Sequence, residues 1–299
     1  MSIYFGQKQT FCTSTINGIS LYLKIPILGE QSTNHYPEKF GKVDNQKDFH
    51  LLETESLLIG ALAQPITYPL DKPIYNIYQK LLELTQDWNL CRIWNYVPYI
   101  NDESEGLENY KSFCKGRSLA FENFYGVDFP VKLPAGTGVG IRDHTYAIYF
   151  IAVKKNIRNV ENPEQVSAYK YPSQYGARSP SFARGTVIKE NGKCIAYLSG
   201  TASIKGHQSM GKGDISKQFE VTFDNMRLVF EEMGFHAGFP NPTLYDRQFT
   251  IYLRHPSDLP VVQQMVKNNF TTSDRIIYLH SDICRLELDI EIEATITEK

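Results

Sequence analysis

Residues 196–203 read Ala-Tyr-Leu-Ser-Gly-Thr-Ala-Ser, and residues 56–63 read Ser-Leu-Leu-Ile-Gly-Ala-Leu-Ala, about 140 residues earlier. Both runs are mostly apolar and contain an internal glycine. This pattern predicts a buried strand with a second segment packed close to the glycine. Because the same outline occurs twice, the chain is predicted to consist of two similar halves.

A helix is expected after each of these strands. Apolar residues recur at helical spacing over Asp71–Leu84 and again over Asp214–Met233. The first segment begins with an aspartate and an early proline, which are helix-start signals. Gly234 directly follows the second segment, as glycines that end helices do.

The two halves continue with the same order of predicted elements. A second strand is expected at Cys91–Val97 and at Gln248–Arg254, and a second helix at Leu107–Phe124 and at Ser257–Phe270. The closing strands are Thr137–Ile141 and Tyr146–Val153 in the first half, and Arg275–Asp282 and Leu286–Thr297 in the second. The order β-α-β-α-β-β in each half predicts an α/β (α+β) fold with helices packed on mixed sheets.

A polar segment separates the halves and is predicted to be a linker. The expected division is an N-terminal half at 1–155, a linker at 156–174 and a C-terminal half at 175–299. Near the N-terminus, Ile19–Leu28 predicts one strand, and the polar stretch Gly29–Phe49 predicts an exposed loop.

The composition is that of an ordinary globular protein. The chain has 299 residues, of which 42% are hydrophobic, so disorder is excluded as its main state. A formal charge of −2 argues against a nucleic-acid partner. No stretch approaches the roughly 20 apolar residues of a membrane span, and no signal peptide is visible. The five scattered cysteines include no CxxC pair. We therefore expect a cytoplasmic, reduced protein without a metal site.

Four segments of the second half resemble the YjgF/RidA family. They are Tyr197–Gly200, Glu231–Gly234, Ile251–Leu253 followed by Asp258–Pro260, and Glu291–Ala294. Together they span about 110 residues. The first half looks like a more diverged copy, so the resemblance implies two tandem YjgF/RidA-like units.

Longer segments make the chain as a whole similar to the chorismatases, which are chorismate-cleaving enzymes built on that fold. These segments are Cys91–Asn101, Phe113–Arg117, Leu133–Gly140, Pro172–Gly185, Ser199–Ser203 and Asp282–Arg285. The resemblance implies chorismate as a small-molecule substrate, with two carboxylates, a ring hydroxyl and an enolpyruvyl ether.

Cleavage of chorismate can begin with protonation of the methylene carbon of the enolpyruvyl ether. The resulting oxocarbenium ion collapses to pyruvate and a ring product. This step needs a carboxylic acid that stays neutral enough to donate a proton. It also needs cations or fixed donors for two carboxylates. No cofactor is expected, because the substrate already carries the reactive ether and a ring poised to become aromatic.

Glu291 is the predicted acid. If Leu286–Thr297 is one strand, Glu287, Asp289, Glu291 and Glu293 share one face. Acids in such a row commonly face solvent. The family resemblance selects Glu291, because both families place their functional glutamate at this position. Burial near apolar walls would raise its pKa and suit it to donate a proton.

Cys284 and Ala202 are expected to influence the product. A free cysteine is usually a small buried hydrophobe. The resemblance instead implies that Cys284 marks the branch that forms 3-hydroxybenzoate, sometimes with 4-hydroxybenzoate. Other chorismatases hydrolyse chorismate to a dihydroxycyclohexadiene carboxylate. Ala202 lies in the other strand that the resemblance connects with product choice.

Five further residues are predicted to bind substrate beside Ala202. They are Arg117, Tyr175, Arg178, Arg184 and Arg254. Each arginine can offer forked donors to a carboxylate. The alternatives are structural: an arginine that pins a loop, a surface charge in a helix at Arg117, or a side chain in water at Arg254.

The leading interpretation is a chorismatase of the hydroxybenzoate-forming kind, with Glu291 as acid and arginines as carboxylate ligands. The alternatives are a hydrolytic chorismatase that releases the dihydrodiol acid, a RidA-like hydrolase acting on imines, and a non-enzymatic module that binds an aromatic acid. YjgF/RidA proteins form trimers with sites between subunits. Two fused copies supply part of such an interface, so a monomer or a small homo-oligomer is expected.

Overall fold

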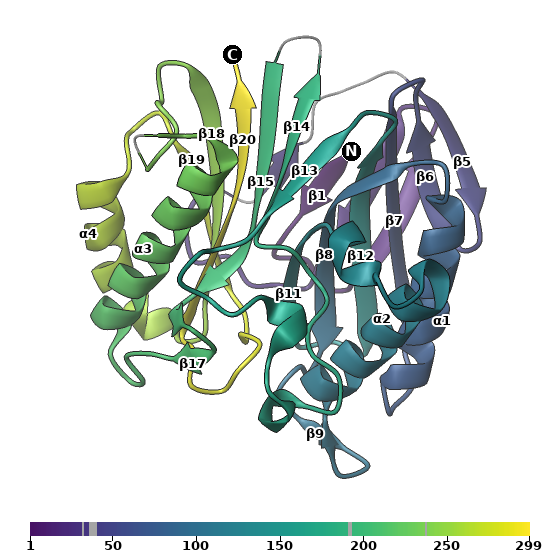
Figure 1. Cartoon of the computed structure of the whole chain (residues 1–299), viewed down its shortest axis with the longest axis horizontal. Coiled ribbons are helices and arrows are strands. Elements are labelled where there is room, and N and C mark those ends of the chain that lie inside the picture. The colour runs from purple at the N-terminus through teal and green to yellow at the C-terminus, as the bar shows by residue number, and fades with distance from the viewer. Residues whose placement is uncertain (32, 36–40, 191–192, 237) are drawn as a thin grey trace.

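The computed structural model describes residues 1–31, 33–35, 41–190, 193–236 and 238–299. These residues form two six-stranded sheets, a four-stranded sheet and two short two-stranded ribbons. Helices cover the outer face of each six-stranded sheet, so the two sheets lie between two layers of helices (Figure 1). No helix in the described ranges is long and apolar enough to cross a membrane.

The first half is built on a sheet with the strand order β11-β8-β12-β7-β6-β5. Its strands are β5 (Lys42–Gln46), β6 (Phe49–Glu53), β7 (Leu57–Pro65), β8 (Asn89–Pro98), β11 (Ala135–Ile141) and β12 (Thr145–Val153). Helices α1 (Asp71–Leu84) and α2 (Asn109–Tyr125) pack on one face through a continuous apolar cluster.

The second half is built on a sheet with the order β13-β14-β15-β20-β18-β19. Its strands are β13 (Ile157–Val160), β14 (Gly185–Glu190), β15 (Lys193–Ala202), β18 (Tyr245–Leu253), β19 (Arg275–His280) and β20 (Ile290–Glu298). Helices α3 (Ile215–Met233) and α4 (Leu259–Asn269) pack on its outer face through a separate apolar cluster.

The two sheets have the same topology. Read from the edge strands β11 and β19, the orders correspond strand for strand, with β8 matching β18 and β12 matching β20. The pairs β8/β11 and β18/β19 are parallel, and the other pairs in each sheet are antiparallel. The predicted duplication of a β-α-β-α-β-β unit is therefore confirmed.

Local signals account for the helix boundaries. The Asp214 side chain accepts a hydrogen bond from the backbone N–H of Lys217 at 3.0 Å and so caps α3. At the other end Gly234 adopts φ +102°, a left-handed conformation that favours glycine. Helix α2 begins at Asn109 rather than at Leu107, because Leu107–Glu108 forms the short strand β10 against β9 (Glu103–Ser104).

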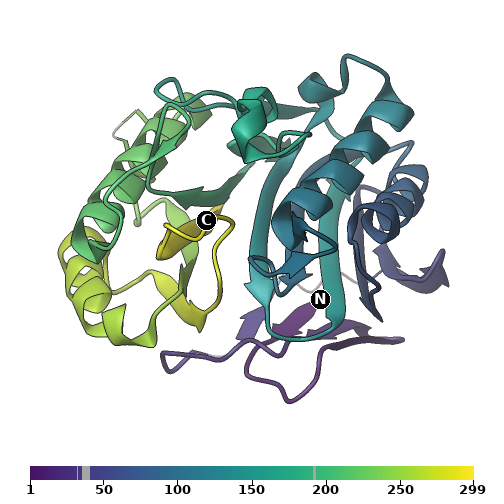
Figure 2. The same ribbon diagram turned by 90° about the horizontal axis from the view of Figure 1, so that it is seen from below.

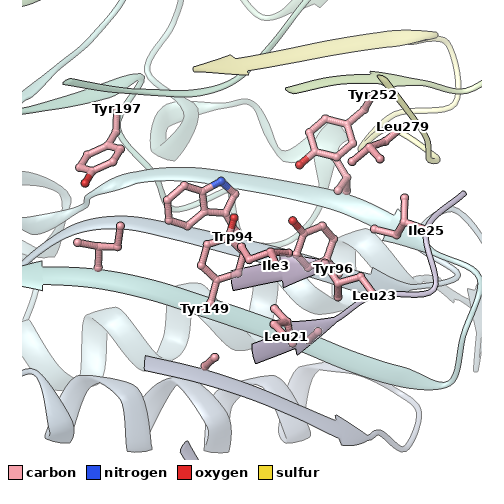
Figure 3. Close-up of a cluster of buried hydrophobic side chains, with 14 of the residues drawn as sticks. Ile3, Leu21, Leu23, Ile25, Trp94, Tyr96, Tyr149, Tyr197, Tyr252 and Leu279 are labelled. Carbon is pink, nitrogen blue, oxygen red and sulfur yellow. The ribbon is translucent and has the colours of Figure 1, made fainter. Parts of the chain in front are cut away.

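A third apolar core lies between the two sheets. Trp94 stacks on Tyr149, with ring centroids 4.2 Å apart, and the Tyr197 ring meets Trp94 edge-on. Figure 3 shows Trp94, Tyr96 and Tyr149 of the first sheet facing Tyr197 and Tyr252 of the second. Because aromatic rings bury large apolar areas, this layer holds the two halves together.

The N-terminal residues form a small sheet of their own, and this corrects the expectation of one strand. Its strands are β1 (Ser2–Tyr4), β2 (Phe11–Thr15), β3 (Gly18–Tyr22) and β4 (Thr33–His35). Ile3 and Leu21 are fully buried against the core between the large sheets (Figure 3). Figure 2 shows this sheet lying across one end of the two large sheets.

Two further expectations need correction. The stretch Gly29–Phe49, expected as an exposed loop, contains β4 and β5, while 32 and 36–40 lie outside the described residues. These strands have only three to five residues, too few to show a clear period. The expected linker, 156–174, contains β13, which pairs with β14 at the edge of the second sheet.

The closing strand of the second half begins later than expected. Leu286–Thr297 was expected to be one strand, but β20 starts at Ile290 and residues 281–289 have no regular secondary structure. Leu288 and Ile290 are both fully buried. The alternation of leucine with acidic residues in this irregular segment has the pattern of a strand, yet Leu286 is exposed.

Candidate active site

A cavity of about 190 Å³ opens where the two halves meet. The first half contributes α2 and β11 to its wall, and the second half contributes β15, β20 and the segment 284–287. Six of the eight predicted site residues line it. They are Glu291, Cys284, Arg117, Tyr175, Arg184 and Ala202. Side chains more than 170 positions apart in the sequence thus meet in one hollow.

Glu291 lies in the middle of the second sheet and is only 4% exposed. It pairs with Ala202 of β15 on one side and with Tyr252 of β18 on the other. The register of β15 against β20 shifts between Leu198 and Thr201. Gly200 lies in this irregular stretch, and a Cβ there would overlap Oε1 of Glu291. The glycine therefore leaves the space that the carboxyl group occupies.

The environment of Glu291 favours its protonated form. Burial and, to a smaller extent, the nearby Glu293 carboxylate raise the pKa of its carboxyl group to about 8. The positive charges of Arg92 and Arg184 act in the opposite direction but do not outweigh burial. At neutral pH the group is therefore mostly a neutral acid that faces the cavity.

Glu293 has a different environment, although it lies only two residues further on the same face of β20. Its carboxylate oxygens accept four hydrogen bonds from buried side chains. The donors are Arg92 Nη2 at 2.7 Å, Thr137 Oγ1 at 2.5 Å, Trp94 Nε1 at 3.0 Å and Tyr252 OH at 3.2 Å. Hydrogen bonds and a guanidinium group stabilise the charged form. Glu293 is thus the ionised member of the pair, and Glu291 the neutral one.

Three arginines at the cavity are buried without a salt bridge, although Glu161 lies near enough for the charge of Arg184 to lower the pKa of its carboxyl group. Arg117, Arg184 and Arg285 are each at most 9% exposed. None of them forms a salt bridge within the described part of the chain, and each leaves at least one guanidinium nitrogen without a hydrogen-bond partner. Buried charge without a partner is costly. The cavity is therefore suited to an anionic ligand.

Aromatic side chains and backbone carbonyls hold these arginines in place. The Arg285 guanidinium lies 3.9 Å from the ring centroid of Tyr175, and its Nη1 donates to the carbonyl of His207 at 2.9 Å. Arg184 Nη2 donates to the Tyr171 hydroxyl at 2.6 Å. Because cation–π contacts and carbonyl acceptors add no negative charge, the positive charge stays available to a ligand.

Cys284 and Ala202 both reach the cavity. Burial and, to a smaller extent, the nearby Glu291 raise the pKa of the Cys284 thiol to about 12. The thiol is therefore neutral at physiological pH and is not a thiolate nucleophile. Cys284 therefore contributes a small, weakly polar side chain to the wall of the cavity.

The structure does not bring Arg178 or Arg254 to the cavity. Arg178 is an ion-pair partner of Glu122 at 2.5 Å on a partly exposed surface. Arg254 is buried, and its donors point to Asn101, Asp282 and backbone carbonyls. Because all the N–H donors of Arg254 are used in hydrogen bonds within the protein, none is left for a ligand.

The four acids expected on one face do not share it either, because the strand begins at Ile290. Glu287 lies at the rim of the cavity and accepts a hydrogen bond from Ser209 Oγ at 2.9 Å. Asp289 accepts one from Gln218 Nε2 at 2.9 Å. Only Glu291 and Glu293 remain together.

Arg285 and the partners of Glu293 are site residues that the sequence alone did not predict. Arg285 directly follows Cys284 within the segment Asp282–Arg285, so the motif contained a signal that was not used. Arg92 lies in the segment Cys91–Asn101 and faces Glu293 across 201 positions. No local pattern links residues so far apart.

A buried neutral acid beside unpaired cations in a concave site is typical of an enzyme that acts on a small anionic substrate. Comparison with known proteins gives a more specific class. Residues 37–152 match the family model described as "Chorismatase FkbO/Hyg5-like, N-terminal". A 3-hydroxybenzoate synthase of Streptomyces hygroscopicus is 35% identical over 233 residues, covering 73% of this chain and 67% of the relative.

Two other comparisons agree. A chorismatase of Streptomyces rapamycinicus is 36% identical over 215 residues, covering 70% of this chain and 64% of the relative. The chain thus spans about two thirds of the length of these curated relatives. A crystal structure of a chorismatase superimposes with a TM-score of 0.86 at 28% identity, covering 99% of this chain and 92% of the other. The chain belongs to the chorismatase family of enzymes.

Replacing Gly200 by alanine tests whether the glycine makes room for the acid. The added methyl group overlaps the Glu291 carboxyl, so we expect turnover to fall by about 10²-fold, the scale of losing a positioned acid. Gly60, the counterpart in β7, is the matched control, because a Cβ there overlaps the buried Phe150 ring instead. Gly60→Ala should lower the melting temperature and leave the turnover of the folded protein close to wild type. Equal turnover of Gly200→Ala and wild type would contradict this role.

The pKa of Glu291 also predicts a pH-dependent stability. The folded state holds a proton up to pH about 8, whereas the unfolded chain releases it near the ordinary value of 4.5. Between these values the folded state binds more protons, so the free energy of unfolding falls as pH rises, by up to about 1.4 kcal/mol per pH unit. Glu291→Gln lacks this contribution. The free energy of unfolding of both proteins would be measured in urea at pH 5, 6, 7 and 8. We expect the stability of Glu291→Gln relative to wild type to increase as the pH rises. A constant difference would count against a protonated Glu291.

Proposed function

We propose that the protein cleaves chorismate to pyruvate and a hydroxybenzoate, with 3-hydroxybenzoate as the main product. One observation carries the proposal: the protonated Glu291 faces a cavity with three guanidinium groups that form no salt bridge among the described residues and keep nitrogens without a hydrogen-bond partner. The similarity to a protein named 3-hydroxybenzoate synthase supports the choice of product. The alternative is hydrolysis to the dihydrodiol acid.

The cavity suits the charges of chorismate. The substrate carries two carboxylates, and Arg117, Arg184 and Arg285 offer planar forks of donors that match such groups. Binding would supply the negative charge that these buried cations lack. An imine of the kind that RidA-like hydrolases act on does not require three cations, so this alternative is less well supported.

Proton transfer from Glu291 would start the reaction. The carboxyl proton moves to the methylene carbon, whose double-bond electrons form the new C–H bond and leave an oxocarbenium ion. The Glu291 carboxylate produced in this step lies beside that cation and stabilises it. Glu293 cannot take over this role, because its four donors hold it in the charged form.

Atom balance separates the two products. Pyruvate and hydroxybenzoate together contain the atoms of chorismate, so this branch consumes no water. In it, the oxygen of the ring hydroxyl bonds to the neighbouring ring carbon that carries the ether, while the bond from that carbon to the ether oxygen breaks and its electron pair becomes part of the pyruvate ketone. The hydroxyl proton passes to the Glu291 carboxylate, which restores the acid. The three-membered ring then opens so that the oxygen stays on the former ether carbon, and that carbon loses its proton to the oxygen as the ring becomes aromatic, which gives 3-hydroxybenzoate. The dihydrodiol branch adds one water molecule, so a cavity that keeps water from the cation favours hydroxybenzoate.

Cys284 fits the water-excluding role. Its thiol is neutral and lines the cavity, so it occupies space near the substrate without activating a water molecule. Both walls of the cavity come from one chain, which supports a functional monomer. The proposed reaction uses only side chains of the protein and needs no cofactor.

Glu291→Gln should abolish proton donation while keeping the shape of the site. We expect pyruvate release from chorismate to fall by about 10²–10⁴-fold, the usual contribution of a general acid. Glu287→Gln is the matched control, since Glu287 lies at the rim of the same cavity. Pyruvate would be followed enzymatically and ring products by chromatography. If Glu291→Gln releases pyruvate at the wild-type rate, another group is the acid.

Cys284→Ala should change the product rather than the rate of cleavage. The smaller side chain leaves space for water, so we expect the dihydrodiol to increase at the expense of hydroxybenzoate, with pyruvate release within a few-fold of wild type. Cys114→Ala provides the comparison, because Cys114 is also buried and lines the cavity from α2. An unchanged product ratio in Cys284→Ala would assign Cys284 a purely structural role.

A further inference from the structure

The segment between β19 and β20 carries four of the residues that line the cavity, Cys284 and Arg285 among them, without the support of a helix or sheet. Residues 281–289 have no regular secondary structure, yet Cys284 and Arg285 reach the cavity from this segment. Backbone groups in such a segment lack the regular partners that a strand provides, and they need other donors when buried. The conformation of the segment therefore depends on side chains packed against it.

Arg254, directly after β18, donates from its side chain to three backbone carbonyls of this segment, and that side chain is only 9% exposed. Its guanidinium group donates five hydrogen bonds. Nε donates to the Leu288 carbonyl at 2.9 Å, Nη1 to Asn101 Oδ1 at 3.0 Å and to Asp282 Oδ1 at 2.8 Å, and Nη2 to the carbonyls of Ile283 at 3.1 Å and Arg285 at 2.9 Å. The acceptors flank Cys284 on both sides.

The contacts also connect the segment to both halves of the protein. Asn101 and Gly140 belong to the first half, and the backbone N–H of Gly140 donates to the Asp282 carbonyl at 2.8 Å. The Ser281 hydroxyl donates back to the Gly140 carbonyl at 2.7 Å. From the second half, the backbone N–H of Arg254 donates to the Asp289 carbonyl at 2.9 Å. Arg254 therefore lies at the point where residues of both halves form hydrogen bonds with the segment.

We propose that Arg254 is a positioning residue that fixes the backbone of residues 282–288 and so holds Cys284 and Arg285 against the substrate. The effect on chemistry rests on the proposed function, because it acts through the product choice and carboxylate binding assigned to those two residues. Lysine cannot replace it, since an ammonium group is a point charge that cannot span three separated carbonyls and a carboxylate. The role differs from direct substrate binding, which the sequence had suggested.

The experiment compares Arg254→Lys with Arg247→Lys. Arg247 is the matched control: it is buried in β18, pairs with Asp274 through Nε at 2.6 Å and Nη2 at 2.5 Å, and does not contact the segment. Labelling of each cysteine by a neutral thiol reagent would be measured by peptide mass spectrometry. In Arg254→Lys we expect Cys284 to react at least about tenfold faster than in wild type, because losing a buried hydrogen-bond network releases the segment. Cys114, on α2, should keep its wild-type rate.

The same variants would be assayed with chorismate. For Arg254→Lys we expect a higher KM and a larger fraction of dihydrodiol, whereas Arg247→Lys should lower only the melting temperature. Asn101→Ala removes one of the five acceptors. It should change Cys284 labelling and the chorismate assay in the same direction by a smaller amount. This variant tests the inference if Arg254→Lys does not fold. Wild-type Cys284 labelling together with a wild-type KM and product ratio would overturn the inference. Failure of the wild-type protein to release pyruvate would refute the proposed function instead, and the labelling would still test the role of Arg254.

Discussion

Two carboxyl groups lie two residues apart on one buried face of β20, and the structure depends on keeping only one of them charged. Like charges at such close range oppose each other's ionisation, more strongly where water is absent. Glu293 receives four donors and remains the anion, while Glu291 receives none of these and faces the cavity. The result is a neutral carboxylic acid beside a carboxylate. Their protonation states differ because their surroundings differ, although the two side chains are chemically identical.

The difference between the two carboxyl groups depends on the presence of two halves. Arg92, Trp94 and Thr137 belong to the first half, and Glu291 and Glu293 to the second. Trp94 and Tyr252 of the aromatic layer between the sheets donate to Glu293, and both glutamate residues are at most 5% exposed. Thus the first half supplies hydrogen-bond donors that hold Glu293 and one wall of the cavity, and the second half supplies Glu291. Neither half contains all the residues that line the cavity, so the candidate site lies between the two halves.

Much of the fold could be predicted from local sequence. The limits of α1 are those expected for Asp71–Leu84, because apolar spacing and a start signal agree over a long segment. The short strands of the N-terminal sheet have too few residues for such a pattern. The irregular segment before Ile290 resembles a strand in sequence, because Leu286 and Leu288 alternate with acidic residues, although only Leu288 is buried.

The site was predicted in part. Glu291, Arg117 and Arg184 do line the cavity, whereas Arg254 satisfies a neighbouring backbone segment. Residue type alone cannot distinguish these arginines, since their roles depend on what lies opposite in the folded chain. Arg285 was overlooked for the same reason.

The most direct test of the account is the protonation state of Glu291 in the folded protein. An infrared difference spectrum between wild type and Glu291→Gln, recorded across a pH titration, isolates the carbonyl band of this single carboxylic acid. The account predicts that the band is present at pH 7 and disappears with a midpoint near 8. A band absent at pH 7, with a midpoint near the ordinary value of 4.5, would contradict it.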